Sequence, residues 1–565
     1  MEKSRKLFAI RQVFGKNNAI LFVLALFPIA GSGVVFIAPY CAALGKGLAE
    51  GSGVPSSLVP IALWTTKQAF FSVLAALALG LPGAWFVGTS ASKSTRTLRA
   101  LSAIPFAMPS ILVVLGFVLF FGNNGIVNRF FMFFTGLKEP PVRILYQTSS
   151  IILAHAFYNF PLVIRLVGDS LEKTRRLLSA PAAVLGANPL VTAVTIFLPA
   201  ILPSLITASL LVFLYSFTSF AVVLVLGGGP KAGTLAVEIY RYARVSLSFR
   251  DAGVLAAAET AIALLVFGLY LFFSHKTQMS TMDSIDRPVY TPKESIFRRI
   301  SFILYLGAIL FLAVGPLLSV FVESFLARSS RAGSVVISLR WWIGVNKNIL
   351  PAFYRSALLA VWSASSSCVL AICAAFSINA LKNLAENEHG ISRFRKSFWR
   401  FLGILIKVCA ISPLLSSGIV LGLGFIIIYG GFFSTSPNSS GVLAVIAIHA
   451  VTVLPFTFNA VMEGFNSIPK NILSAAEVMG AHPLMRLLAV DIPMSAIHIR
   501  SAWGFAAALS LGELNAVMML GLENFETLPL LIYRAAGAYR YGTACAAGVI
   551  LILCCTGALL LTREK

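Results

Sequence analysis

The stretch HAFYNFPLVIRLVGDSLEKTRRLLSAPAAVLGANPLVTAVTIFLP, His155–Pro199, recurs without a gap as HAVTVLPFTFNAVMEGFNSIPKNILSAAEVMGAHPLMRLLAVDIP, His449–Pro493. The two copies lie 294 positions apart in a chain of 565 residues, and eleven of their 45 paired residues are identical. Self-similarity at a fixed long period indicates two copies of one structural unit. Each copy places a polar segment around a glycine between two apolar runs, so we expect the function to use this segment twice.

The composition places the chain among membrane proteins. Hydrophobic residues make up 58% of it and charged residues 12%, with a mean hydropathy of +0.88. A soluble core could not absorb so much apolar surface at this length, whereas a membrane-crossing helix needs roughly 20 largely apolar residues. Twelve segments satisfy this, near residues 19–41, 59–90, 101–122, 147–168, 195–226, 251–273, 299–326, 350–380, 401–430, 441–463, 494–520 and 541–562. We therefore predict an all-α polytopic membrane protein with twelve transmembrane helices, six in each half.

The net charge of +23 would also suit a nucleic-acid-binding protein, but the Lys and Arg residues lie mostly in the loops between the predicted spans. More of them fall on the inner side than on the outer side if the N-terminus is cytoplasmic. Because positive charge in short loops is retained inside, we expect both termini and both repeated segments to face the cytoplasm. The sequence predicts a multi-pass protein of the inner membrane that contacts the lipid bilayer and no nucleic acid.

A long polar stretch separates the two halves. It reads SHKTQMSTMDSIDRPVYTPKESIFR and has the composition of a cytoplasmic linker. We predict a first repeat of six spans over residues 1–276, a linker over 277–298 and a second repeat over 299–565. The repeated polar loops then occupy residues 173–199 and 467–493.

Each loop contains a glycine that is followed thirteen residues later by a proline, Gly186 with Pro199 and Gly480 with Pro493. Small residues before the glycine allow a short helix to fit into a groove on a partner, the glycine allows a sharp turn, and the proline fixes the re-entry into the next span. In the second copy, Pro469 marks the first turn of such a helix. The alternative is two ordinary cytoplasmic turns, each with a glycine cap.

The segments APAAVLG (180–186) and SAAEVMG (474–480), each followed by a degenerate I-x-L-P, resemble the E-A-A-x-x-x-G loop of ABC importer permeases. The resemblance implies a type I ABC importer permease fold and a short helix that docks in a cleft of a separate ATPase subunit. It assigns this coupling role to Ala182, Ala183, Gly186, Ala187, Pro199, Ala475, Ala476, Glu477, Gly480, Ala481 and Pro493.

The two loops depart from the pattern of that family. Ala180 and Ser474 stand at the position of its first glutamate, and Pro181 replaces its first alanine. We expect the helix of the first loop to start late for this reason. Glu477 is the candidate for a substitute carboxylate.

A wider match narrows the resemblance. The segments 155–165 and 216–230, together with Thr234 and 238–240, are similar to the thiamine ABC importer permeases. Those permeases, like the related ferric-iron permeases, are single-chain fusions of two six-span units. The resemblance implies transport of thiamine or its phosphates, with ferric iron as the alternative substrate.

The chain has no G-x-x-x-x-G-K-[ST] segment, because GGGPKAGT (227–234) has Gly233 where the pattern requires Lys. We therefore expect no enzyme activity and no cofactor bound by this chain. The resemblance implies two copies of an ATP-binding cassette subunit, which would hold ATP and Mg²⁺, and an extracytoplasmic substrate-binding protein.

Glu259 and Glu513 lie inside predicted spans, where a charge costs at least about 2.5 kcal/mol. They are candidates to line the transport path and meet a cationic substrate, or else they pair with groups on neighbouring helices. His155 and His449 begin the fourth span of each half. A metal site is conceivable there, but a lone histidine repeated twice favours packing or a hydrogen bond.

A rival from another class is an ion-coupled secondary transporter, since such carriers are often built from repeats of six spans. The duplicated Gly–Pro loop argues against it, because a carrier has no use for an ATPase-docking segment. A purely structural role would not need that segment twice.

Overall fold

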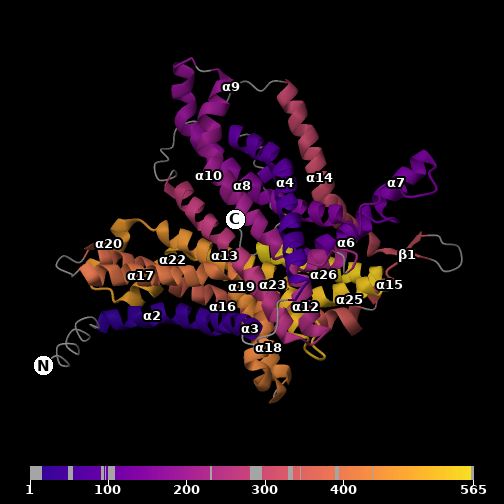
Figure 1. The fold of residues 1–565 in the computed structure, drawn as a ribbon. Coiled ribbons are helices and arrows are strands. Elements are labelled where there is room, and N and C mark those ends of the chain that lie inside the picture. Colours follow the sequence, from indigo (N-terminus) through magenta and orange to yellow (C-terminus); the bar gives the residue numbers. More distant parts are fainter. Residues whose placement is uncertain are drawn as a thin grey trace. The chain divides into compact units, whose positions relative to one another are not determined.

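The computed structural model of the chain is almost wholly helical (Figure 1). It describes residues 16–48, 55–90, 94–95, 97–99, 108–186, 188–229, 232–279, 296–328, 335–343, 345–387, 393–435 and 437–560. Within these residues, eleven helices are long and apolar enough to cross a membrane, and Gly418–Gly430 is a shorter apolar helix. The predicted all-α membrane fold is confirmed, while most of the predicted linker 277–298 lies outside the described residues.

The chain divides into two compact units, which are described separately. Unit 1 comprises Met1–Ala43, Leu350–Leu528 and Leu551–Lys565, and unit 2 comprises Leu44–Ile349 and Pro529–Ile550. Four helices cross from one range to the next: α3 (Ala38–Leu48), α16 (Val345–Asn387), α25 (Leu528–Gly537) and α26 (Tyr541–Leu560). These two units differ from the two sequence repeats, and the bounds of the repeats stay a prediction.

Unit 2 holds most elements of the first half and the first elements of the second half. They are α4 (Leu58–Thr89), α6 (Ser110–Phe121), α7 (Ile126–Thr135), α8 (Thr148–Val184), α9 (Pro189–Thr192), the π-helix η2 (Ala193–Phe197), α10 (Leu198–Phe217), α11 (Ala221–Leu226), α12 (Leu235–Arg244), α13 (Phe249–Met279), α14 (Ile296–Glu323) and α15 (Arg340–Ile343). The strands β1 (Leu326–Arg328) and β2 (Val335–Ile337) pair antiparallel, with Ala327 opposite Val336.

Unit 1 holds most elements of the second half and the first elements of the chain. They are α2 (Lys16–Ser32), the π-helix η1 (Gly33–Ile37), α17 (Arg393–Ile411), the 3₁₀ turn η4 (Ser412–Leu415), α18 (Gly418–Thr435), α19 (Pro437–Asn466), α20 (Lys470–Val478), α21 (Pro483–Arg486), the π-helix η5 (Leu487–Asp491), α22 (Ile492–Met494), α23 (Ala496–Leu511) and α24 (Asn515–Leu520). The eleventh predicted span, 494–520, is therefore broken: α23 has 16 residues, and α24 follows after a turn.

Helix α4 shows why these helices suit a membrane. Its small residues are buried against α8 and α10 in one apolar cluster that includes Ala76, Ala84 and Val163. A Cβ added to Gly80 would lie 2.6 Å from the Cβ of Val163, so the backbones approach closely. Large apolar side chains on other positions of α4 are exposed instead, among them Leu63 at 65%. Small residues inside and large apolar residues outside are the pattern of helices packed in lipid.

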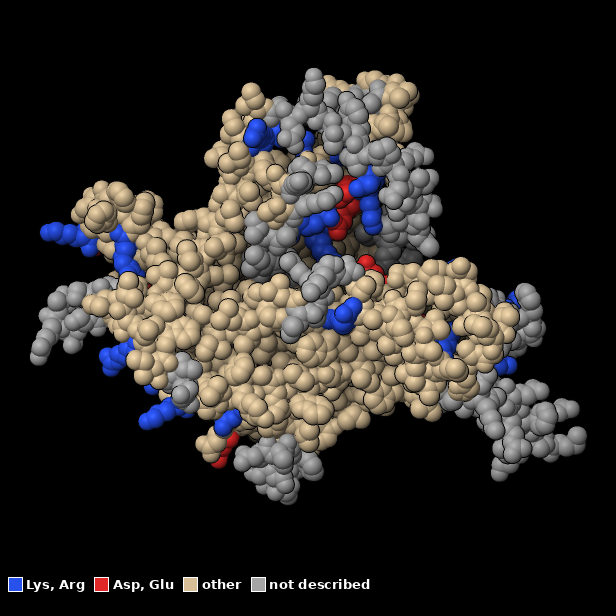
Figure 2. Space-filling view, turned by 180° about the vertical axis from the view of Figure 1, so that it is seen from behind, with Lys and Arg blue, Asp and Glu red and all other residues tan. Residues whose placement is uncertain are grey.

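The described surface is poor in charge. Figure 2 shows one face on which uncharged side chains form most of the described surface, while Lys and Arg side chains stand in small groups. The short helix α7 precedes Pro140. Its phenylalanines are exposed, with Phe133 at 83% and Phe134 at 69%, as suits a helix at an apolar interface.

Candidate functional site

The first repeated loop lies in unit 2, between two long helices. Helix α8 ends at Val184, and Gly186 then turns the chain with φ +71°. The short helix α9 follows, and the π-helix η2 leads into α10, which carries Pro199 near its start. A positive φ is accessible to glycine without steric cost, so Gly186 is where the chain leaves α8.

The second loop, in unit 1, has the same backbone conformation. Gly480 follows α20 with φ +76°. The elements α21 and η5 begin at Pro483 and Leu487, each 294 positions after α9 and η2. The match extends to α24, which begins 294 positions after α11. The repeat seen in the sequence is thus a repeat of backbone conformation, including the π-helix, and π-helical turns are rare and frequently lie at functional sites.

Both loops present apolar side chains at their tips. Val184 and Val478 occupy matching positions, and both are 88% exposed. The next residues, Leu185 and Met479, are 84% and 80% exposed. Among the described residues, a Cβ added to either loop glycine would meet no atom within 4 Å. Two neighbouring exposed apolar side chains on a polar loop, present twice, are a feature of a surface that a partner covers.

The alanines of the motif anchor these tips. Ala182 and Ala476 occupy matching positions and are buried, with 5% and 4% of their surfaces exposed. Pro199, Ala475 and Pro493 are exposed, and Ala481 is half-buried. Ala187 lies outside the described residues, and the side chains of Ala183 and Glu477 are not described. The coupling role of all these residues remains a prediction.

The helices that lead into the two loops differ. Helix α8 is continuous for 37 residues and contains Pro181, so the expectation that the first loop helix starts late is wrong. Pro181 lies in the last turn, where α8 is already formed and the loss of one backbone hydrogen bond is tolerated. In the second copy the chain breaks after Asn466, and α20 starts at Lys470, directly after Pro469. That start agrees with the prediction.

A buried ion pair holds the second loop, and sequence reasoning missed it. Arg486 Nε lies 3.3 Å from Asp491 Oδ2, with 9% and 6% of the two side chains exposed. The guanidinium also lies 5.0 Å from the centre of the Phe376 ring. A spacing of five residues brings two side chains together on a π-helix, whereas on an α-helix it separates them. The first loop has Thr192 and Phe197 at these positions.

Glu513 lies at the start of α24 in unit 1. Its carboxylate accepts hydrogen bonds from the backbone amides of Asn515 and Ala516, both at 3.1 Å. Its Oε2 lies 3.2 Å from His449 Nε2, with 10% and 1% of the two side chains exposed. His449 Nδ1 is 3.0 Å from Ser510 Oγ. This geometry gives Glu513 partners within the protein, and its role in the transport path stays a prediction.

The first half has a related polar centre without the carboxylate. His155 Nδ1 lies 3.2 Å from Ser72 Oγ, so the interpretation of both histidines as hydrogen-bonded residues is confirmed. Ser216, which matches Ser510, accepts a hydrogen bond from Asn159 Nδ2 at 3.3 Å. Glu259 lies on α13 and is 1% exposed. Its place in a transport path also stays a prediction.

The chain is similar to one family of transport proteins. The family described as "Binding-protein-dependent transport system inner membrane component" matches residues 80–278 and 389–563. The thiamine transport system permease protein of Brucella suis is 26% identical over 510 residues, which cover 90% of this chain and 88% of that protein. The proteins of the same name from Haemophilus influenzae and Escherichia coli are 25% and 24% identical, over 87% and 81% of this chain. The spermidine/putrescine transport system permease protein PotB of Escherichia coli is 30% identical over 171 residues, 30% of this chain.

Proposed function

Because this chain belongs to the inner membrane components of binding-protein-dependent transport systems, we propose that it is the permease of an importer for thiamine or its phosphates. The chain is an ABC importer permease and a multi-pass protein of the inner membrane. One observation carries the proposal to thiamine: relatives named as thiamine permeases match along about 90% of the chain, through both repeats. Ferric iron is the alternative substrate.

The loop geometry supports a coupling mechanism. The exposed Val184 and Val478, each at the end of a helix, fit a cleft on an ATPase subunit, where burial of an apolar side chain is favourable. Helix α8 spans about 55 Å at 1.5 Å per residue, so movement at its loop end is transmitted to its far end. Closure of the ATPases on ATP then favours one state of the permease over the other through differential binding.

The partners follow from the same loops. Importers of this family use an ATPase and a substrate-binding protein, and two loops with one conformation provide two docking sites. We assign one ATPase subunit to each loop, hence two copies. ATP and Mg²⁺ are held by those subunits, and this chain neither binds a cofactor nor catalyses a reaction. Both loops and both termini face the cytoplasm, and the binding protein docks on the other side.

Uptake into vesicles tests this function. The permease is reconstituted with its ATPase, loaded binding protein is added, and uptake of radiolabelled thiamine and of Fe(III) is followed with and without ATP. We expect uptake of thiamine that requires ATP. Uptake driven by an ion gradient without the ATPase would contradict the ABC mechanism, and ATP-dependent uptake of Fe(III) alone would contradict the substrate.

A variant connects that uptake to the loops. Gly480→Pro removes the positive φ, because proline fixes φ near −65°, so we expect thiamine uptake to fall to background. Gly430→Pro would not serve as a control, because Gly430 lies within α18 and a proline there would disrupt that helix. The matched control is Ile337→Asp, which changes an 82% exposed apolar residue in β2 and should leave uptake unchanged.

A further inference from the structure

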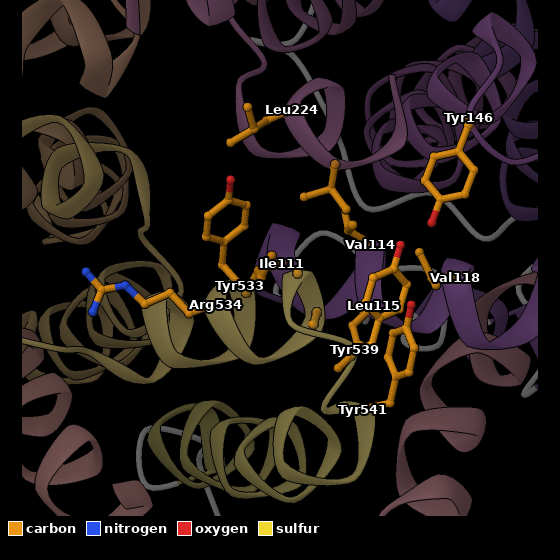
Figure 3. Close-up of a pocket in the computed structure, with 13 residues that line it drawn as sticks. Ile111, Val114, Leu115, Val118, Tyr146, Leu224, Tyr533, Arg534, Tyr539 and Tyr541 are labelled. Carbon is orange, nitrogen blue, oxygen red and sulfur yellow. The ribbon is translucent and has the colours of Figure 1, made fainter. Parts of the chain in front are cut away.

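A cavity of about 440 Å³ lies within unit 2, at the end of α8 opposite to the first coupling loop (Figure 3). Its apolar wall comes from α6 and α11, with Val114 and Leu224 among the lining residues. Its polar wall comes from the loop before α8 and from α25 and the start of α26. Cavities of this size and mixed lining are usual for small organic ligands.

Four of the lining residues are tyrosines: Tyr146, Tyr533, Tyr539 and Tyr541. In Figure 3, Tyr146, Tyr539 and Tyr541 lie together on one side of the cavity, while Tyr533 stands apart on α25. The rings of Tyr539 and Tyr541 are 6.1 Å apart between centroids and nearly perpendicular, at 82°. Two segments that are far apart in the sequence, the loop before α8 and residues 539–541, thus bring three phenols to one side of the cavity.

Two of these tyrosines have a left-handed backbone. Tyr146 has φ +61° and Tyr539 has φ +57°, and they are two of only four such non-glycine residues in the described part of the chain. This conformation is unfavourable for a residue with a Cβ and tends to occur at ligand-binding sites. The backbone of Gly228 packs against Tyr146, since a Cβ there would lie 2.8 Å from the Tyr146 Cβ. Close packing therefore fixes the backbone and the Cβ of Tyr146, from which the ring projects.

The chemistry of the lining selects the ligand. Tyrosine rings attract a cation to their faces and stack with aromatic rings. Partial burial, and then the nearby Tyr539, raises the pKa of Tyr146 above its ordinary value, so the phenol stays neutral and can donate a hydrogen bond. Arg534 lines the same cavity, but in Figure 3 its guanidinium points away from the three clustered tyrosines. A ligand cation is therefore favoured at the tyrosine cluster and disfavoured near Arg534.

We propose that this tyrosine cavity is a binding site for an aromatic organic cation, which the permease accepts before transport. The proposal rests on the import function proposed above, because thiamine carries a positively charged thiazolium ring beside a pyrimidine ring. The cavity lies at the end of α8 away from the ATPase loops. It is thus placed to receive the solute from the binding protein.

An aromatic belt at the membrane interface is the simpler explanation of tyrosines at helix ends. Exposure does not separate the two explanations, because Tyr539 is 80% exposed and Phe133 on α7 is 83% exposed. The pocket tyrosines differ because they converge on one cavity and two of them have a strained backbone. The two explanations also differ in what substitution does to ligand binding.

Binding to the purified permease–ATPase complex, without the binding protein, tests the proposal. Equilibrium dialysis compares thiamine with thiochrome, an uncharged aromatic derivative. We expect the wild type to bind thiamine and not thiochrome. Tyr541→Leu and Tyr539→Leu should each weaken thiamine binding about threefold to thirtyfold, as expected for loss of one cation–π contact. Tyr541→Phe keeps the ring face and should bind almost as the wild type does.

Two controls separate binding from folding and from the import function. Phe133→Leu and Phe134→Leu change exposed rings outside the cavity and should not affect binding, and ATPase activity of each complex reports correct assembly. If assembled Tyr→Leu variants bind thiamine as well as the wild type does, or if thiochrome binds equally well, the tyrosine cavity is not the site. If the wild type imports no thiamine in vesicles, the proposed function itself is wrong.

Discussion

The carboxylate of Glu513 contacts both a helix N-terminus and a buried histidine. It accepts hydrogen bonds from the amides that begin α24, and it lies 3.2 Å from the buried His449. A carboxylate at a helix N-terminus satisfies amides that have no partner within the helix and interacts favourably with the helix dipole. In the first half, Ser219 occupies the matching position. The second half thus has a carboxylate at a position where the first half has a hydroxyl.

Glu513→Gln should lower the stability of the protein. The glutamine side chain keeps one acceptor oxygen, but its N–H₂ group would face a backbone N–H that itself needs an acceptor. We therefore expect the free energy of unfolding to fall by about 1–3 kcal/mol. Thermal unfolding in detergent, followed by tryptophan fluorescence, measures it. Ser219→Ala is the matched control and should change stability by no more than about 0.5 kcal/mol. Equal effects of the two substitutions would show that the carboxylate is not a structural cap.

At the same scale, Arg486 and Asp491 form a pair whose removal is testable in two steps. Asp491→Asn leaves a buried guanidinium without its ion-pair partner, which costs about 3–5 kcal/mol. The double substitution Arg486→Met with Asp491→Leu removes both charges and should recover most of this loss. Unfolding of the single and double variants supplies the measurement. A double variant as unstable as Asp491→Asn would mean that packing, and not charge, sets the effect.

Among the elements, the turns of the two repeated loops and the start of α20 were predicted well from the sequence, whereas the start of the first loop helix was not. The glycines and prolines of the two loops act through backbone geometry, which is local, so their turns and helix ends could be predicted residue by residue. The partner of Glu513 could not be predicted, because His449 lies 64 positions earlier and only packing brings them together. The tyrosine cavity was missed for the same reason: Tyr146 and Tyr539 come from distant segments.

The loop tips give a prediction at the scale of the element. Val184→Asp and Val478→Asp each put a charge on a residue that is 88% exposed, so stability should change by no more than about 0.5 kcal/mol. Docking of the ATPase should weaken, because the tip would then bring a charge into an apolar cleft. Co-purification of the ATPase with the permease measures docking, and uptake measures coupling. Normal uptake by the double variant would exclude the two tips as docking sites.

At the scale of the whole molecule, the tandem repeat and the compact units divide the chain differently. The N-terminal segment up to Ala43 belongs to unit 1, together with residues 350–528 from the second half. Tyr429 on α18 donates a hydrogen bond to the carbonyl of Val34 at 3.2 Å. The repeat shows only which residues resemble one another along the chain. The packing of the N-terminal segment with the second half could therefore not be predicted from the sequence. Packing of the first span against the second half makes the fused chain more than two independent halves.

Two glycines of α18 test this packing. A Cβ on Gly424 would collide with the backbone of Pro39 in the N-terminal segment, whereas a Cβ on Gly430 would meet no described atom within 4 Å. Gly424→Ala should therefore destabilise the protein by about 1–3 kcal/mol through overpacking. Gly430→Ala should be neutral or should stabilise it by up to about 1 kcal/mol, because alanine favours the helix. Both are measured by thermal unfolding of the full chain in detergent. If the two substitutions had the same effect, α18 and the N-terminal segment would not be in contact, and each half would then have to fold around its own first span.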